Sequence, residues 1–133
     1  MDCLFCKIIN KEIPAKVIFE NEAAIAALDI HPRAPGHTVV LPKHHAPVLT
    51  ELTDEHVGPV FLAVKEVAKK LKNVLECDGL TIGINQGREA GQEIDHLHIH
   101  LIPRWGGDRG GSVQSVVNNP PSSTEEMFKK FQV

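Results

Sequence analysis

The run His96-Leu97-His98-Ile99-His100-Leu101-Ile102-Pro103 constrains the fold of this chain more than any other segment. Successive side chains of a β-strand point to opposite faces, so the three histidines are predicted to share one face and the leucine and isoleucine side chains the other. The apolar face is expected to pack on a core. The imidazole face has no packing reason to contain three histidines, and imidazole attacks, carries protons or binds metals near neutral pH. The run therefore predicts a catalytic or metal-binding strand.

The remaining patterns predict a single α+β domain over residues 1–133, with an antiparallel sheet of about five strands. Apolar residues recur every three or four positions between 53 and 75, which predicts one long helix. Proline removes a backbone donor, so Pro59 is expected either to begin this helix or to bend it. The other expected strands, beside the histidine run, cover residues 17–20, 23–28, 37–41 and 79–85.

Short helices are expected at both ends of the chain. One or two helical turns are predicted near residues 3–10, before Ile13-Pro14. Ser123-Thr124-Glu125-Glu126 has the spacing of a capping box and predicts a helix from there to about Phe131. Residues 104–122 are rich in glycine and proline and are expected to be irregular.

Charge and cysteine content exclude several classes of protein. The formal net charge is −3 at pH 7 and no Lys/Arg-rich run occurs, which argues against a nucleic-acid polymer as partner but allows a mononucleotide. No segment resembles a signal peptide or reaches membrane-spanning length, so a cytoplasmic protein without a membrane partner is expected. Three cysteines, an odd number, do not indicate a disulfide framework.

The histidine face allows two interpretations from the residues alone. Histidines two positions apart on a strand lie about 7 Å apart at the backbone, so His98 and His100 can converge on one phosphoryl group. One imidazole would then attack phosphorus while another serves the leaving group. The alternative is a zinc site built from all three histidines.

Cys3-x-x-Cys6 has the spacing of a zinc-binding pair, but two thiolates do not complete a tetrahedral site. Histidines would have to supply the other two ligands. A redox pair, or two reduced thiols packing the first helix, are the alternatives. The candidate histidines outside the run are His31, His37, His44, His45 and His56.

The loop from Asn85 to Gln92 directly precedes the histidine run. Gly87 and Gly91 allow the backbone to approach a ligand closely, and the side-chain amides of Asn85 and Gln92 offer donors. Beside three histidines, this loop is a candidate phosphate cradle.

The run from His96 to Ile102 resembles the His-φ-His-φ-His-φ-φ signature of the histidine-triad superfamily, where φ is apolar. The chain is similar to the small bacterial and eukaryotic nucleotide hydrolases of that superfamily over about residues 1–105. The similarity implies the histidine-triad fold and a homodimer. The other segments that carry it are Cys3 to Ile9, Leu28 to His37, Leu41 to His45 and the Asn85 to Gln92 loop.

The resemblance implies specific roles for the residues of the catalytic site. His98 would attack the α-phosphorus of a nucleotide and form a nucleotidyl-histidine intermediate. His100 would contact the phosphate and assist proton transfer to the leaving group. The remaining implied roles are ribose binding by Asp29, base binding near Ile30, support of the triad by His37, and phosphate and leaving-group contacts from Asn85 and Gln92.

The zinc-bearing members of the superfamily imply a structural Zn²⁺ bound by Cys3, Cys6, His45 and His96, with His44 as the alternative to His45. Four protein ligands leave no position for a water nucleophile. Glu93 and Asp95 depart from the residues common at these positions, so substrate specificity is not carried over. Histidine rather than glutamine at position 100 favours water as the final acceptor.

These observations together predict a nucleoside phosphoramidase that releases a nucleoside monophosphate. Two alternatives are a dinucleoside polyphosphate hydrolase using the same chemistry, and a nucleotide-binding regulatory protein with negligible turnover.

Overall fold

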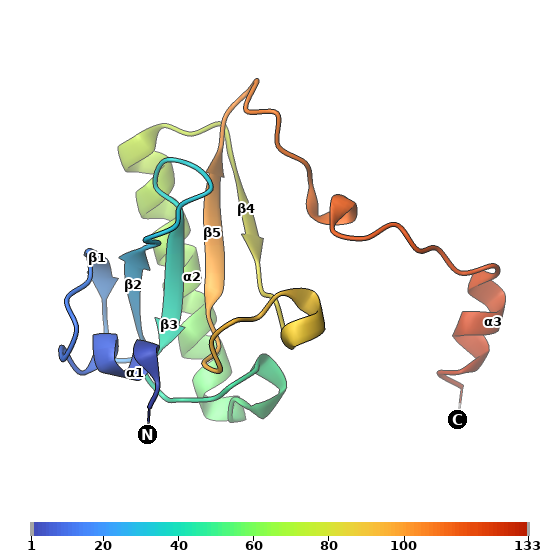
Figure 1. Ribbon diagram of the computed structural model, residues 1–133, viewed down its shortest axis with the longest axis horizontal. Helices are drawn as coiled ribbons and strands as arrows, with labels where there is room; N and C mark the ends of the chain where they lie inside the picture. The colour runs from blue at the N-terminus through green and yellow to red at the C-terminus, as the bar shows by residue number, and fades with distance from the viewer. Residues whose placement is uncertain (1, 133) are drawn as a thin grey trace.

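The computed structural model describes residues 2–132 and contains a five-stranded sheet in which neighbouring strands are antiparallel (Figure 1). The spatial order β1-β2-β3-β5-β4 leaves β1 and β4 at the edges. The predicted α+β class and the antiparallel sheet are thus confirmed. The strands are β1 (Val17–Glu20), β2 (Ala24–Leu28), β3 (Thr38–Pro42), β4 (Gly79–Gly83) and β5 (Ile99–Arg104).

One long helix and two short terminal helices accompany the sheet, as the sequence predicts. Pro59 neither begins nor divides the long helix, which starts five residues earlier. The carbonyl that Pro59 leaves without an intrahelical donor is that of Glu55, an exposed residue of the first turn, where water can replace the missing bond. The helices are α1 (Leu4–Ile9), α2 (Asp54–Leu75) and α3 (Thr124–Lys129), with single 3₁₀ turns η1 (Leu49–Glu51), η2 (Arg88–Ala90) and η3 (Val113–Ser115).

The strand that contains the histidine run is shorter than predicted, because β5 begins at Ile99 rather than at His96. His96 and His98 lie in the segment directly before it. From Leu97 onward burial still alternates, since Leu97, Ile99 and Leu101 are buried whereas His98 and His100 are partly exposed. His96 departs from this pattern because its side chain is 0% exposed.

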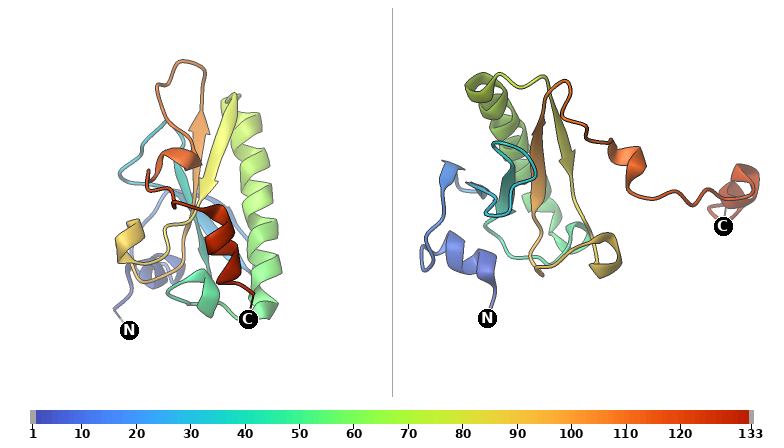
Figure 2. Two further views of the ribbon diagram at one scale, coloured as in Figure 1. Left: turned by 90° about the vertical axis from the view of Figure 1, so that its right-hand side faces the viewer. Right: turned by 45° about the horizontal axis from the view of Figure 1, so that its top comes forward.

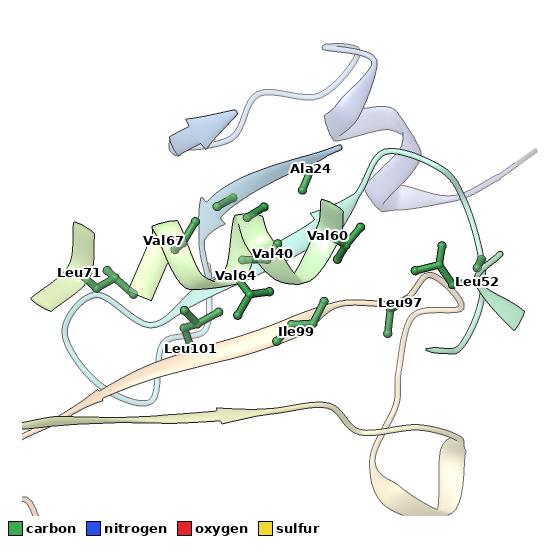
Figure 3. Close-up of a cluster of buried hydrophobic side chains, with 13 residues drawn as sticks. Ala24, Val40, Leu52, Val60, Val64, Val67, Leu71, Leu97, Ile99 and Leu101 are labelled. Carbon is green, nitrogen blue, oxygen red and sulfur yellow. The ribbon is translucent and has the colours of Figure 1, made fainter. Parts of the chain in front are cut away.

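The two faces of the sheet pack against different helices. Figure 2 shows α2 along one face and α1 on the other side of the sheet. Between α2 and the sheet lies a cluster of aliphatic side chains (Figure 3). Each valine, leucine or isoleucine in it contributes about 1.5–3 kcal/mol when fully buried. A smaller cluster beneath α1 contains Phe5, Ile25, Val39 and Leu41. The main cluster includes Val40, Val60, Val64, Val67, Leu71, Leu97, Ile99 and Leu101.

Because side chains alternate along β5, the residues between those of the main cluster face the α1 side. His98 and His100 therefore lie on the same face of the sheet as Phe5. The loop between β2 and β3 reaches the same region, since His37 contacts His100. Three segments far apart in sequence thus meet at the histidine run.

After β5 the chain passes β4 and extends away from its own sheet (Figure 1). Arg104 fixes the start of this tail through an ion pair with Asp108 and a hydrogen bond to Thr81 of β4. Ser123 caps α3 by accepting a hydrogen bond from the backbone N–H of Glu126, as the sequence predicts. In the described chain, no helix combines the length and apolar character needed to cross a membrane.

Candidate functional site

The hydrogen bond made by His98 leaves one of its ring nitrogens unprotonated. Nδ1 of His98 lies 2.8 Å from the main-chain carbonyl oxygen of His96. A carbonyl oxygen only accepts hydrogen bonds, so Nδ1 must carry the ring proton and donate it. In the neutral ring, Nε2 then keeps its lone pair. His98 is partly exposed, and this nitrogen can act as a nucleophile or as a metal ligand.

A chain of hydrogen bonds fixes the tautomers of His37 and His100. The backbone N–H of Arg33 donates to Nδ1 of His37 over 3.0 Å, so the proton of His37 is on Nε2. That Nε2–H donates in turn to Nδ1 of His100, also over 3.0 Å. Neutral His100 therefore carries its proton on Nε2. The site combines an acceptor nitrogen on His98 with a donor nitrogen on His100, and the two ring centroids are 5.1 Å apart.

Burial keeps this hydrogen-bond chain neutral. Loss of solvation lowers the pKa of His100 to about 4, with smaller contributions from the nearby His98 and His37. Burial also lowers the pKa of His37, and the neighbouring Asp29 opposes this shift. Both rings are consequently uncharged at pH 7, as their shared hydrogen bond requires.

Asp29 and Ile30 lie at the entrance to the β2–β3 loop. One carboxylate oxygen of Asp29 accepts a hydrogen bond from the backbone N–H of His31 over 2.8 Å, and the other lies 3.5 Å from Nε2 of His37. Asp29 also lines an open pocket together with residues 32–37. The Ile30 side chain is 82% exposed, a large apolar surface beside an anionic acceptor. This pairing suits a ligand with both hydroxyl and apolar parts.

Cys3, Cys6, His45 and His96 converge on one point. Cys3 Sγ lies 3.4 Å from Nδ1 of His96, and Cys6 Sγ lies 3.4 Å from Nδ1 of His45. The two Nδ1 atoms are 3.0 Å apart, and all four ligand atoms lie within 4.8 Å of one another. Metal–ligand distances of about 2.0–2.3 Å in a tetrahedron separate the ligands by about 3.3–3.8 Å. The cluster thus has nearly the dimensions of a tetrahedral zinc site.

The tautomer of His96 also fits a metal. Its Nε2 lies 2.9 Å from the carbonyl oxygen of Pro42, so Nε2 carries the proton and Nδ1 directs its lone pair at the cluster. Burial, followed by the neighbouring Cys3, raises the pKa of the Cys6 thiol to about 11. A cation among these ligands would offset that shift and hold the sulfur as a thiolate.

A second group of potential ligands, Asp29, His37 and His100, does not fit a metal as well. The Arg33 N–H is fixed in the backbone and occupies the lone pair of His37 Nδ1. Nε2 of His37 must then carry a proton, which excludes it as a ligand in this arrangement. The group is therefore better described as a hydrogen-bonded support for His100.

One of the two loop amides predicted to contact the substrate differs from expectation in its contacts. The sequence predicts that Gln92 contacts phosphate or leaving group, but its amide is committed to the backbone: Oε1 accepts from Gly87 N–H, and Nε2 donates to the carbonyls of Pro47 and Ile94. Gln92 therefore organises the loop instead of presenting a free amide. Asn85 is exposed and lies beside Gly91.

The structure also distinguishes His45 from His44. The ring of His44 stacks on that of His56 with centroids 4.1 Å apart, outside the four-residue cluster, whereas His45 is part of it. Sequence reasoning missed Phe5, which contacts the ring of His98 edge-on. Its position between the two cysteines is the one sequence signal that points to it.

Comparison with known proteins matches residues 10–107 to the HIT domain family. A HIT-like protein of Methanocaldococcus jannaschii is 50% identical over 106 residues, covering 80% of this chain and 81% of that protein. An adenosine 5'-monophosphoramidase of Candida albicans is 40% identical over 106 residues, covering 77% and 70%. The crystal structure of a zinc-bound histidine triad family protein from Mycobacterium smegmatis is 34% identical, with a TM-score of 0.77 and coverage of 97% and 89%.

Proposed function

The chain belongs to the HIT domain family, and on that premise we propose that it is a nucleoside phosphoramidase. It would cleave the bond between the α-phosphorus of a nucleotide and its leaving group, and release a nucleoside monophosphate. The observation that carries this proposal is the hydrogen bond from His98 Nδ1 to the carbonyl of His96, which leaves Nε2 unprotonated. The adenosine 5'-monophosphoramidase among the relatives supports the substrate class.

The reaction has two steps at His98. Its Nε2 attacks phosphorus, and the phosphorus–nitrogen bond breaks as the nucleotidyl-histidine forms, while a proton from solvent, transferred with the assistance of His100, reaches the leaving nitrogen so that it departs as the neutral amine. Water then attacks the same phosphorus, gives its proton to solvent, and the bond from phosphorus to His98 breaks. In both steps the Nε2–H of His100 donates a hydrogen bond to the phosphoryl group, where negative charge increases in the transition state.

Asp29, Ile30 and His37 supply the nucleotide contacts in this proposal. The Asp29 carboxylate accepts hydrogen bonds from the ribose hydroxyls, and Ile30 offers apolar surface to the base. His37 holds His100 in the donor tautomer. Asn85 contacts the leaving group, while Gln92 holds the loop that contains it.

Zinc is the metal best suited to the cluster of Cys3, Cys6, His45 and His96, and the zinc-bound relative supports this assignment. Two thiolates and two imidazoles are the donor set of structural zinc sites. The metal would join α1 to the segment before β5 and leave His98 free. Cys3, Cys6 and Cys77 are free thiols, which agrees with a cytoplasmic location.

The proposed substrate class is tested by comparing the rates of hydrolysis of three compounds. These are adenosine phosphoramidate, its guanosine counterpart and a diadenosine polyphosphate. We expect release of the monophosphate from a phosphoramidate, and loss of this activity by at least about 1,000-fold in His98→Ala, because no second nucleophile replaces the imidazole. Acid-quenched reactions of the wild type should contain nucleotide bound to His98. His56→Ala, a histidine outside the site, serves as the control and should retain activity.

Each contrary outcome points to a different function. Turnover of the diadenosine compound alone would replace the phosphoramidase by a polyphosphate hydrolase. Nucleotide binding without turnover would indicate a regulatory protein. Full activity in His98→Ala would contradict the mechanism itself.

We further propose that the protein is a homodimer in which β4 pairs with β4 of a second copy. β4 is an edge strand without charge or proline, the features that normally protect an exposed edge. The tail beyond β5 leaves its own sheet (Figure 1). Its apolar side chains are exposed, and a second copy would cover them. These exposed residues are Val113, Val116, Val117, Met127, Phe128 and Phe131.

Light scattering tests the dimer. The full chain should have twice the mass of one copy at micromolar concentration. A chain ending at residue 111 should dissociate at a concentration at least about tenfold higher, because the apolar tail contacts are gone. A monomeric full chain would contradict the proposal.

A further inference from the structure

Phe5 lies between Cys3 and Cys6 in α1 and contacts the ring of His98. The two ring centroids are 5.0 Å apart with an interplanar angle of 67°, an edge-to-face contact. The same phenyl ring makes an edge contact with His96, with centroids 5.9 Å apart and an angle of 87°. Phe5 is buried together with Ile25, Val39 and Leu41 on the sheet face that carries the histidines. The proposed nucleophile is therefore part of the packing beneath α1.

The ring of His98 has to be held in one orientation for its Nε2 to attack. Rotation of the ring by half a turn would exchange the positions of its carbon and nitrogen atoms and break the Nδ1 hydrogen bond to His96. That bond alone holds the ring at one point. Phe5 contacts the ring, and so does His100, with centroids 5.1 Å apart. The two neighbours restrict this rotation by contact.

Two of the three groups that orient His98, the carbonyl of His96 and the ring of Phe5, lead back to the proposed metal cluster. His96 supplies the carbonyl oxygen for His98 and a ligand atom for the cluster. Phe5 is separated from each cysteine ligand by at most one residue, and the backbone N–H of Cys6 donates to Cys3 Sγ over 3.3 Å. The position of α1 on the sheet therefore depends on the same four side chains that would bind zinc.

We propose that Phe5 is a positioning residue for His98, and that the cysteine-flanked helix α1 couples metal binding to the orientation of the nucleophile. The inference rests on the proposed function, in which His98 Nε2 attacks phosphorus. In this arrangement the bound metal would contribute to turnover without contacting the substrate. Loss of the metal shifts α1, releases the ring of His98, and lowers the fraction of molecules in which Nε2 faces the substrate.

The test compares zinc-loaded wild type with Phe5→Leu and Phe5→Tyr, and with Phe19→Leu as matched control. Phe19 is a partly buried phenylalanine that packs against the main core on the α2 side, so its substitution removes similar apolar volume far from His98. Two properties are measured: kcat and KM for adenosine phosphoramidate, and the tautomer of His98 from long-range ¹H–¹⁵N NMR spectra at fixed pH. The same spectra are recorded after zinc is removed with a chelator.

In zinc-loaded wild type, His98 should show the Nδ1–H tautomer alone. Phe5→Leu and metal removal should each give averaged tautomers, and Phe5→Leu should lower kcat about 5–20-fold with KM changed less than twofold. Phe5→Tyr, which keeps an aromatic edge, should recover most of kcat, and Phe19→Leu should resemble wild type. Metal removal should affect kcat less in Phe5→Leu than in wild type, because one contact is already lost.

Three results would overturn the inference. The first is a His98 tautomer that is unchanged in Phe5→Leu and in the metal-free protein. The second is a change in KM alone, which would place Phe5 in substrate binding. The third is an equal loss of kcat in Phe19→Leu, which would indicate a general effect of core packing. If wild type has no turnover, the proposed function fails, and the NMR comparison still decides whether Phe5 orients His98.

Discussion

Nε2 of His37 donates a hydrogen bond to Nδ1 of His100 over 3.0 Å, which joins the β2–β3 loop to the face of β5 that carries the histidines. The direction of this bond follows from the backbone N–H of Arg33, which donates to the other nitrogen of His37. A backbone donor cannot change its protonation state. The Arg33 N–H therefore fixes the tautomer of His37, and His37 in turn fixes that of His100. As a result, His100 presents an N–H rather than a lone pair to the site.

Substitution of His37 tests this arrangement. In His37→Ala, Nδ1 of His100 loses its donor, both tautomers of His100 become accessible, and kcat should fall about 10–100-fold, as is common when an orienting partner of a functional histidine is removed. KM should change less, because the proposed ribose-binding carboxylate of Asp29 keeps its hydrogen bond from the backbone N–H of His31. Steady-state kinetics with adenosine phosphoramidate provide the measurement. Unchanged kcat would show that the tautomer of His100 does not matter.

The lowered pKa values of His37 and His100 predict that stability falls in acid. Between about pH 6.5 and 4, His100 binds a proton in the unfolded chain but not in the folded one, so the free energy of unfolding decreases as pH falls through this window. His37, whose pKa burial also lowers, contributes in the same direction below about pH 6.5. One fully buried group would contribute a slope of about 1.4 kcal/mol per pH unit. His100 is partly exposed, so its contribution is smaller.

Urea unfolding at several pH values between 7.5 and 5 measures this slope. His100→Asn should have a flatter dependence than wild type, since the variant lacks one of the two groups. Protonation of the metal ligands affects both proteins alike and cancels in the comparison. Equal slopes would indicate that His100 titrates normally in the folded state.

The sequence predicts the architecture well because its apolar patterns are long. The repeat over residues 53–75 defines α2, and the alternation from Leu97 to Leu101 defines the buried face of β5. The start of β5 was placed too early for a reason that lies in its partner strand. The register that pairs Val40 with Ile99 brings Pro42 opposite Leu97, and proline has no N–H to continue the ladder. Leu97 N–H donates instead to the carbonyl of Ala46.

The side chains of the candidate site could be identified from sequence, but the groups that orient them could not. Spacing marks Cys3 and Cys6, and the resemblance to the zinc-bearing histidine-triad proteins adds His45 and His96. The structure brings these four side chains together. The tautomers depend on the backbone N–H of Arg33 and the backbone carbonyls of Pro42 and His96. Every residue type offers the carbonyl and every type but proline offers the N–H, so residue identity does not indicate these contacts. Gln92 illustrates the same limit, since nothing in its identity shows that backbone groups occupy its amide.

Removal of one cysteine ligand should reduce both metal content and stability. Cys3→Ala leaves three ligands for zinc, so metal bound after purification without added zinc should fall from about one equivalent to well below that. Unfolding should occur at lower temperature, because the metal no longer ties α1 to the segment before β5. Elemental analysis and thermal unfolding measure the two effects. Cys77→Ala, a buried cysteine outside the cluster, is the control and should keep its zinc.

Gly36 couples the site loop to α2, and its substitution should destabilise the fold. Its φ of 83° is unfavourable for other residues, and a Cβ at this position would collide with Cδ1 of Leu75. Gly36→Ala should therefore lower the free energy of unfolding by about 1–2 kcal/mol, mainly through backbone strain, because the end of the Leu75 side chain can move aside. Gly58→Ala, where a Cβ meets nothing within 4 Å, should instead stabilise α2 by about 0.5–1 kcal/mol. Urea titration of both variants measures the difference, and a Gly36→Ala protein as stable as wild type would show that the β2–β3 loop adjusts freely against α2.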